Sequence, residues 1–120
     1  MNSVVLAWPD KALSPNARVH WSKKSKVVKE TRSNAFMACR IAGLIAPKTD
    51  GKLHLWIDFH PPSNRRIDDD NCLGRFKCQR DGIADYLGID DRIFESHPSV
   101  KEKVAGGCVK VRITAEINGV

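Results

Sequence analysis

The feature that most constrains the fold is a short run of strict alternation in the middle of the chain. From Leu53 to Phe59, apolar residues alternate with more polar ones, a pattern typical of a strand with one buried face. The turn-forming pair Asp50-Gly51 precedes this run, and Pro61-Pro62 ends it. The sequence therefore predicts a half-buried strand that is short and sharply bounded.

Helical periodicity is found on both sides of this strand. Before it, apolar residues recur at three-to-four spacing in a segment that Ser22 can cap and that should run to about Ala46, ahead of Pro47. After it, a second helix should begin within residues 68–71 and reach about Leu87. Each helix has one apolar stripe, and both are expected to cover the same face of a sheet.

Three further strands are expected from short runs rich in β-branched residues. They cover residues 4–8, 92–100 and 108–117, and the last two are expected to form a hairpin around Ala105-Gly106-Gly107. The order β-α-β-α-β-β predicts an α+β fold, with a small mixed sheet and two main helices. With 120 residues there is room for one core, so residues 1–120 are expected to form a single domain.

Nothing in the sequence indicates export or membrane insertion. The first residues lack the positive start and long apolar run of a signal peptide, and no apolar run reaches the roughly 18 residues of a membrane span. The four cysteines show no C-x-x-C spacing, which favours reduced thiols. A cytoplasmic protein without membrane contact is therefore expected.

The balance of charge gives the first indication of a partner. Lysine and arginine number 20 against 14 aspartate and glutamate residues, a net charge of +6. A basic domain suits a polyanion, nucleic acid before an anionic membrane, although a merely soluble basic protein has the same composition. Lys23, Lys24 and Lys26 lie in the first turns of the first helix, where cations oppose the helix dipole. That placement favours contact with phosphate, with a solvated helix face as the alternative.

The most informative cluster is Asp68, Asp69 and Asp70, followed by Asn71. One explanation is structural, because carboxylates at a helix N-terminus cap free N–H groups and interact favourably with the dipole. The other is chemical. In extended or N-cap geometry, residues two apart point the same way, so Asp68 and Asp70 converge while Asp69 points elsewhere. Two convergent carboxylates suit a hard cation such as Mg²⁺ or Mn²⁺.

Two further features follow along the second helix. Lys77 falls on the same helix face as Asp70 and can reach toward a phosphate held there, although it is also placed for an ion pair with Asp81. Asp90 and Asp91 come just past the helix end, about 27 Å from its start if the helix is straight. They join the first aspartates only through a helix kink, a folded-back turn or a second subunit. Otherwise they form an acidic turn.

Taken together, these segments resemble a known family. The residues that carry the resemblance are Arg65-Arg66-x-Asp68-x-Asp70-Asn71, Lys77-x-x-x-Asp81 and Asp90-Asp91, with Leu6-Ala7-Trp8-Pro9 and Ser14-Pro15-Asn16 near the N-terminus. They resemble the RusA-type Holliday junction resolvases, endodeoxyribonucleases of bacteria and lambdoid prophages, and in particular the phage-borne branch. The resemblance spans nearly the whole chain. One departure is that the family's lysine lies three residues after the asparagine in the best-known form of the motif, where this chain has Gly74.

The resemblance implies a homodimer that binds four-way DNA junctions and nicks two opposing strands symmetrically, with Mg²⁺ or Mn²⁺ and no organic cofactor. It places the metal on Asp68, Asp70 and Asp91, with Lys77 as the assisting cation. Contacts to the DNA backbone are then expected from Lys23, Lys24, Lys26, Arg65 and Arg66.

Several expectations around this site depend on structure. Asn71 is expected to fix the turn that holds Asp70, and Val109, Val111 and Ile113 are candidate dimer contacts if the last strand lies at a sheet edge. Two alternatives stay open. One is a non-catalytic DNA-binding protein whose aspartates only cap a helix, and the other is a metal nuclease for other branched DNA.

Overall fold

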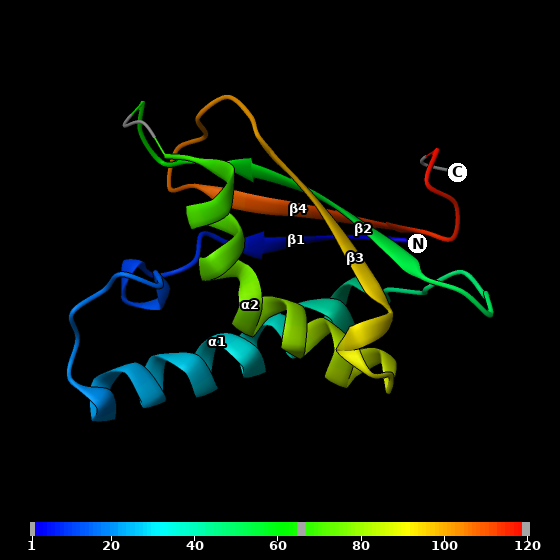
Figure 1. The fold of residues 1–120 in the computed structure, drawn as a ribbon, viewed down its shortest axis with the longest axis horizontal. Coiled ribbons are helices and arrows are strands. Elements are labelled where there is room, and N and C mark those ends of the chain that lie inside the picture. Colours follow the sequence, from blue (N-terminus) through cyan, green and yellow to red (C-terminus); the bar gives the residue numbers. More distant parts are fainter. Residues whose placement is uncertain (1, 65–66, 119–120) are drawn as a thin grey trace.

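The computed structural model describes residues 2–64 and 67–118, without the side chain of Asp69, and the elements below belong to these residues. The strands and α-helices are β1 (Ser3–Ala7), α1 (Trp21–Ala42), β2 (Leu53–His60), α2 (Asp69–Leu87), β3 (Phe94–Val100) and β4 (Cys108–Thr114). Two short 3-10 turns, η1 (Lys11–Leu13) and η2 (Asp91–Ile93), precede α1 and β3 (Figure 1). The predicted α+β fold is confirmed.

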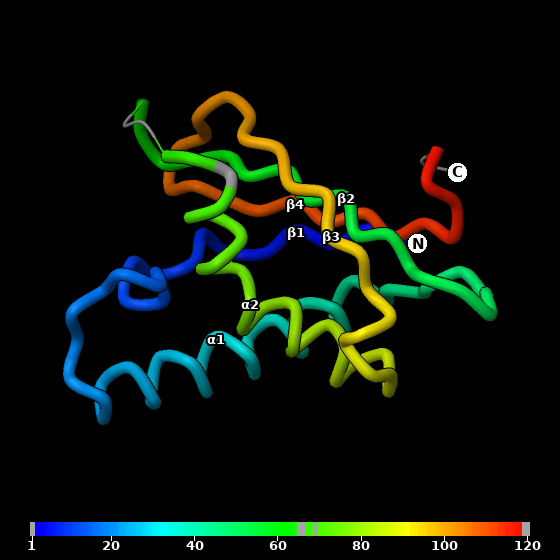
Figure 2. The backbone as a smooth tube through the Cα atoms, in the orientation of Figure 1, coloured from blue at the N-terminus to red at the C-terminus, as the bar shows by residue number. Residues whose placement is uncertain are grey.

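The strands of the described chain form one mixed sheet in the order β1-β4-β2-β3. β4 pairs antiparallel with both β1 and β2, whereas β2 and β3 run parallel. Parallel neighbours need a crossover connection, and α2 supplies it. Both helices lie on the same side of the sheet, as the ribbon and the backbone tube show (Figures 1 and 2). Within residues 2–64 and 67–118, no helix lies on the opposite face of the sheet.

The predicted hairpin between the last two strands is wrong. β2 lies between β3 and β4, so those two strands are not hydrogen-bonded to one another. The glycines at 106–107 do form a turn. The segment that contains this turn leads from β3, at the edge of the sheet, past β2 to β4. The cause is the α2 crossover, which places β3 outside β2 rather than beside β4.

This topology also removes the candidate dimer contacts on the last strand. β4 is an inner strand, and Val109, Val111 and Ile113 are at most 1% exposed. They belong to the hydrophobic core together with Phe76 from α2 and Cys39 from α1. The edges of the sheet are β1 and β3, and Pro98 within β3 suits an edge position because proline cannot donate to a ladder.

The helix ends are set by individual caps. α1 begins two residues earlier than a Ser22 cap would place it, because the Nδ1 atom of His20 accepts a hydrogen bond from the Ser22 amide at 3.2 Å. It ends at Ala42 rather than near Ala46, because Gly43 adopts a left-handed conformation, with φ 67°, that closes the helix. The expected bounds of α2 are confirmed, with Asp68 and Gly88 as its caps.

The two helices cross at Gly82. A Cβ atom there would lie 2.4 Å from the carbonyl oxygen of Arg32 and 2.8 Å from the Cβ of Ala35, so the backbones approach as closely as a glycine permits. One turn further, Arg32 donates two hydrogen bonds to the carboxylate of Asp85, at 2.5 and 2.7 Å. This crossing fixes the direction of α2 and therefore the position of its N-terminus.

Two general properties accompany the fold. No disulfide joins the four cysteines, all of which lie among the described residues, and burial raises the pKa of the Cys39 thiol to about 11. Within the described ranges, neither helix has a stretch long and apolar enough to cross a lipid bilayer.

Candidate functional site

A cleft of about 1090 Å³ opens at the N-terminus of α2. Residues from the start of the helix, from the segment after β1 and from the loop after β2 line it. The polar and aromatic residues most relevant to its chemistry are Trp8, Asp10, Lys11, Asp68, Asn71 and Arg75. Trp8 is anchored by an edge-on contact with Phe59 of the core, with ring centroids 6.3 Å apart. The cleft therefore has one wall fixed to the core and one formed by the helix start.

Asp68 lies in this cleft as the N-cap of α2. Its backbone is extended, and its Oδ1 atom accepts a hydrogen bond from the Asn71 amide at 2.7 Å. This confirms the structural role expected for the cluster and keeps the carboxylate at the positive end of the helix dipole. Asp70 follows in the first turn and is exposed, but it is not among the residues that line the cleft.

Asn71 joins the helix start to the loop after β1. Its side-chain amide donates to Ser14 Oγ at 3.4 Å, and its carbonyl oxygen accepts from Arg75 Nε at 3.1 Å. One turn along the helix, Gly74 meets Pro15, whose Cγ would lie 2.6 Å from a Cβ at that position. Gly74 stands where the best-known motif of the RusA-type resolvases has its lysine. In this chain, that position packs the helix against the loop at Pro15.

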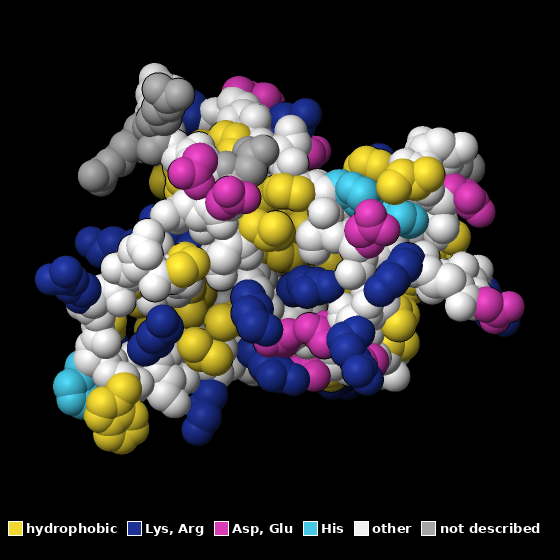
Figure 3. All heavy atoms as spheres, viewed as in Figure 1, with side chains coloured by type: hydrophobic (Ala, Val, Ile, Leu, Met, Phe, Trp, Pro, Cys, Tyr) yellow, Lys and Arg dark blue, Asp and Glu magenta, His cyan; other side chains and the backbone are white. Residues whose placement is uncertain are grey.

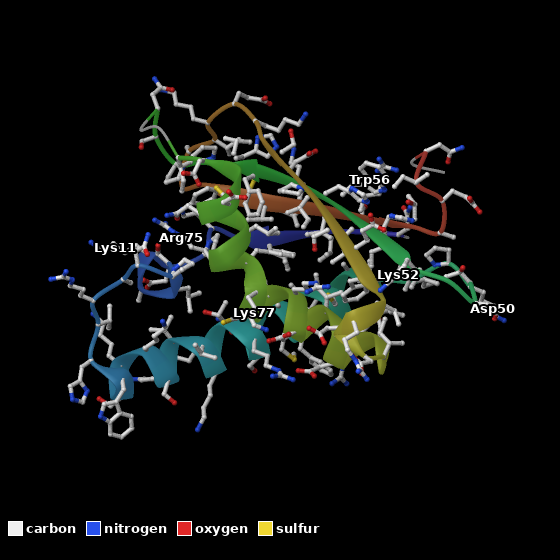
Figure 4. The ribbon with its side chains drawn as sticks, viewed as in Figure 1. Lys11, Asp50, Lys52, Trp56, Arg75 and Lys77 are labelled. Carbon is white, nitrogen blue, oxygen red and sulfur yellow. The ribbon has the colours of Figure 1, made fainter. Side chains whose placement is uncertain are left out.

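Among the described residues, the cations that line the cleft are Lys11 and Arg75, neither of which was among the predicted site residues. Both are seen at the cleft in Figure 4, whereas Lys77 lies further along α2. The Lys77 side chain is 71% exposed, and its Nζ atom is 3.9 Å from the Asp81 carboxylate, the ion pair named as the alternative. The sequence does contain a signal for Arg75. This residue follows Asp68 by seven positions, or about two helical turns, so the two residues lie on the same face of the helix.

The structure does not bring Asp91 to Asp68 and Asp70 within one chain. Asp91 starts η2, past the C-terminal end of α2, and the 19 residues of the helix span about 28 Å. Its carboxylate lies 3.9 Å from Arg80. Its neighbour Asp90 caps η2, and hydrogen bonds from the Arg92 side chain and amide lower the pKa of Asp90 to about 2.

The expected DNA-contacting lysines lie on the first turns of α1. Lys23 and Lys26 are exposed and Lys24 is partly exposed, and Lys26 has Glu30 one turn away at 4.0 Å. Beside them Trp21 is 76% exposed, with its ring 5.6 Å from that of His20. In the view of Figure 3, lysine and arginine side chains spread over both helices.

Part of the expected site lies outside the described residues. Arg65 and Arg66, which were expected to contact DNA, belong to this part, as does the side chain of Asp69. Their neighbours on either side are Asn64, which is exposed, and Ile67, which lines the cleft.

Comparison with known proteins gives a relative whose name carries no activity. No protein-family model matches the sequence. An uncharacterized protein from Xylella fastidiosa (strain Temecula1 / ATCC 700964) is 52% identical over 117 residues, which cover 95% of this chain and 76% of that protein. Identity at this level over almost the whole chain means that the two share one fold. The chain therefore belongs to the same family as this Xylella fastidiosa protein.

Proposed function

We propose that the chain is a metal-dependent endodeoxyribonuclease that cleaves four-way DNA junctions. One observation carries the proposal: the capping carboxylate Asp68 shares a cleft with two cations, Lys11 and Arg75. A carboxylate that can hold a metal beside cations that can hold a phosphate is an arrangement suited to metal-dependent phosphodiester hydrolysis. The sequence resemblance to RusA-type resolvases supplies the substrate class.

The donor set fits Mg²⁺ or Mn²⁺. Asp68, which lines the cleft, and Asp70, which is exposed in the first turn of α2, would hold the ion, because hard divalent cations prefer carboxylate oxygens. Asp68 uses Oδ1 for the helix cap, which leaves its second oxygen for a ligand. When bound, such an ion lowers the pKa of a coordinated water and polarises the phosphoryl oxygens.

The remaining residues bind and orient the phosphate. The hydrogen bond that Arg75 donates to Asn71 restricts the orientation of its guanidinium group. Lys11 is the second cation of the cleft, and together the two offset the charge that develops on the phosphate oxygens. Lys77 is assigned to this role by the resemblance, while its ion pair with Asp81 supports a surface role.

A DNA arm would lie along the start of α1. Lys23, Lys24 and Lys26 supply phosphate contacts, with Arg65 and Arg66, which precede α2 in the sequence. The exposed ring of Trp21 offers a stacking surface for a base that loses a stacking neighbour at the point of strand exchange. A homodimer would give one site for each of two opposing strands, matching the two-fold symmetry of the junction.

The test is cleavage of a synthetic four-way junction and a matched linear duplex, with and without Mg²⁺. We expect paired nicks in the junction only when Mg²⁺ is present. Asp68→Asn and Asp70→Asn should abolish nicking and retain junction binding, because each removes a charge that holds the cation without removing a DNA contact. Asp50→Asn, in the exposed turn far from the cleft (Figure 4), is the matched control and should cleave normally.

The same experiment separates the alternatives. The capping role of Asp68 supports the alternative of a protein that only binds DNA. Such a protein would bind the junction with and without Mg²⁺ and would break no strand. A nuclease for other branched DNA would cleave a flap or a fork faster than the junction. Full activity of both asparagine variants would place the catalytic site elsewhere.

The DNA surface has its own test. Binding through phosphates should weaken steeply with salt, and Lys24→Ala should make the log–log slope shallower by about one unit. Trp21→Ala should weaken junction binding several-fold at every salt concentration and leave the slope unchanged, because stacking releases no counterions. A salt-independent affinity would remove the basis for this surface.

A further inference from the structure

Outside the cleft, three metal-ligating side chains meet on the face of the sheet that carries no helix. His54 lies on β2, and Glu95 and His97 lie on the neighbouring strand β3. In the parallel register His54 stands opposite Glu95, and Trp56 stands opposite His97. All four residues therefore share one face, opposite to the buried Leu53 and Leu55. Histidine side chains reach the surface over these strands in Figure 3.

The ligand atoms of this group are close together. His54 Nδ1 lies 2.9 Å from His97 Nε2 and 3.7 Å from a carboxylate oxygen of Glu95. The three ligand atoms all lie within 4.8 Å of one another, and within the described residues no other set of three such side chains does so. Two ligand atoms that each lie about 2.1 Å from a tetrahedral ion are about 3.4 Å apart. Both observed separations differ from this spacing by roughly half an ångström or less.

We propose that His54, Glu95 and His97 bind a transition-metal ion of the Zn²⁺ class. Two imidazole nitrogens and one carboxylate suit Zn²⁺ and its neighbours, whereas Mg²⁺ prefers oxygen ligands alone. Three protein ligands leave a fourth position open to water or to an incoming ligand. The site is thus distinct in chemistry and in place from the proposed Mg²⁺ site at the start of α2.

The surroundings hold His97 in the required orientation. Its ring stacks on Trp56, with centroids 4.3 Å apart and planes 17° from parallel. Trp56, labelled in Figure 4, is itself fixed because its Nε1 donates to Thr114 Oγ1 at 2.7 Å. His54 is only 7% exposed and cannot turn away into solvent. Metal-ligating histidines are usually held in orientation by such neighbours.

The competing explanation is a hydrogen bond between the two imidazoles, with Glu95 as a nearby acceptor. A neutral pair satisfies the 2.9 Å contact when one ring donates and the other accepts. That arrangement has no affinity for a metal beyond that of any exposed histidine. The two explanations therefore differ in stoichiometry, in affinity and in the response to single substitutions.

The experiment is titration of the purified full-length protein with Zn²⁺, by calorimetry and by competition with a chromophoric chelator. We expect one ion per chain, bound at least tenfold more weakly by Glu95→Gln and by His97→Gln. Glu95 is half exposed, so its glutamine variant should keep the fold, which circular dichroism checks. His20→Gln is the control, because His20 is exposed and caps α1, which lies on the other side of the sheet, and the affinity of this variant should equal that of the wild type. Absence of saturable binding, or equal affinity in all variants, would overturn the proposal.

A second readout does not depend on these substitutions. Bound Cu²⁺ should quench the fluorescence of Trp56 through the stacked His97, and Trp56→Phe should lose this quenching while still binding one ion. The Asp68→Asn variant should bind Zn²⁺ with the affinity of the wild type. Millimolar Mg²⁺ should not displace Zn²⁺ from the protein. Quenching that persists in Trp56→Phe, or Zn²⁺ binding lost in Asp68→Asn, would place the ion elsewhere. A failed nuclease assay leaves both readouts intact.

Discussion

Asp68 has a structural duty that does not depend on any chemistry. Its carboxylate caps α2 at 2.7 Å, and replacement of an N-cap aspartate by alanine typically costs about 1 kcal/mol. Asparagine caps a helix nearly as well, so Asp68→Asn removes the charge and keeps the cap. For this residue, the asparagine variant isolates the chemical role and the alanine variant does not.

At the same scale, Arg75 and Lys77 decide which cation assists cleavage. Arg75 lines the cleft with Asp68, whereas Lys77 is 71% exposed and paired with Asp81. We expect Arg75→Ala to slow junction cleavage by about 10²–10³, the usual effect of losing one positioned charge at a developing oxyanion. Lys77→Ala should stay within a few-fold of the wild type and cost at most about 0.5 kcal/mol of stability. Single-turnover rates measure both. The reverse result would restore the lysine that the resemblance assigns.

Single residues also show how far the sequence can predict the site. Asp68 and Asn71 line the cleft, and like the lysines of α1 they stand in local patterns from which they were predicted as candidates. Lys11 was not, because it reaches the cleft only through the contacts of its loop with Asn71 and Gly74. The group of His54, Glu95 and His97 was missed for a similar reason, since it exists only when β2 and β3 are neighbours.

At the scale of elements, periodicity and caps predicted the helices and the central strand. The alternation of Leu53–Phe59 and the Asp68 and Gly88 caps act within a few residues, so the sequence carries them directly. Strand pairing depends instead on the path of the chain after α2, which places β3 beside β2. The glycines at 106–107 indicated a turn correctly, and the partner of β4 was still wrong.

The crossing of α1 and α2 gives an element-scale prediction at Gly82. Alanine is the better helix former by about 1 kcal/mol, so propensity alone predicts that Gly82→Ala stabilises the protein. A Cβ there would instead lie 2.4 Å from a backbone oxygen of α1, and such overpacking costs about 1–3 kcal/mol. We expect a net loss of about 1–2 kcal/mol in urea unfolding. Gly51→Ala, in an open loop, should change stability by no more than about 0.5 kcal/mol. Equal stability of the two variants would mean that the helices can separate at no cost.

The ion pair across the same crossing makes stability depend on pH. The hydrogen bonds from Arg32 hold the pKa of Asp85 below its ordinary value. A lowered carboxyl pKa stabilises the folded state above the ordinary pKa, and that stabilisation is lost as the pH falls through the lowered value. Both side chains are more than a third exposed, so solvent screening limits the contribution to about 0.5–1 kcal/mol.

The measurement is urea unfolding of the wild type and Asp85→Asn, first at neutral pH and then at a pH below the lowered carboxyl pKa. The wild type should be the more stable at neutral pH, and the difference should vanish in acid and shrink in high salt. A difference that stays constant with pH would mean that packing rather than charge connects these helices.

For the whole molecule, α2 separates two groups of acidic residues. Asp68 and Asp70 stand at one end, and Asp91 stands beyond the other, about 28 Å away along the helix. The expected dimer surface on β4 is buried, which leaves exposed apolar residues such as Met37 and Ile41 on α1, 44% and 83% exposed, as candidates for contact with a second copy. Only a second chain can therefore supply Asp91 to the proposed site.

This arrangement predicts that two inactive variants restore one another. If Asp91 completes the site of the partner subunit, Asp68→Asn and Asp91→Asn are each inactive alone. When the two are unfolded together and refolded, each mixed dimer contains one site in which both aspartates are intact, so junction nicking should return. That dimer has a single working site, so it should nick one strand without the paired, symmetric second cut. The assay is strand scission on a junction labelled in all four strands, with each refolded single variant as the control. Mixed dimers that stay inactive would show that Asp91 takes no part in the partner's site, and an active Asp91→Asn homodimer would remove it from the mechanism.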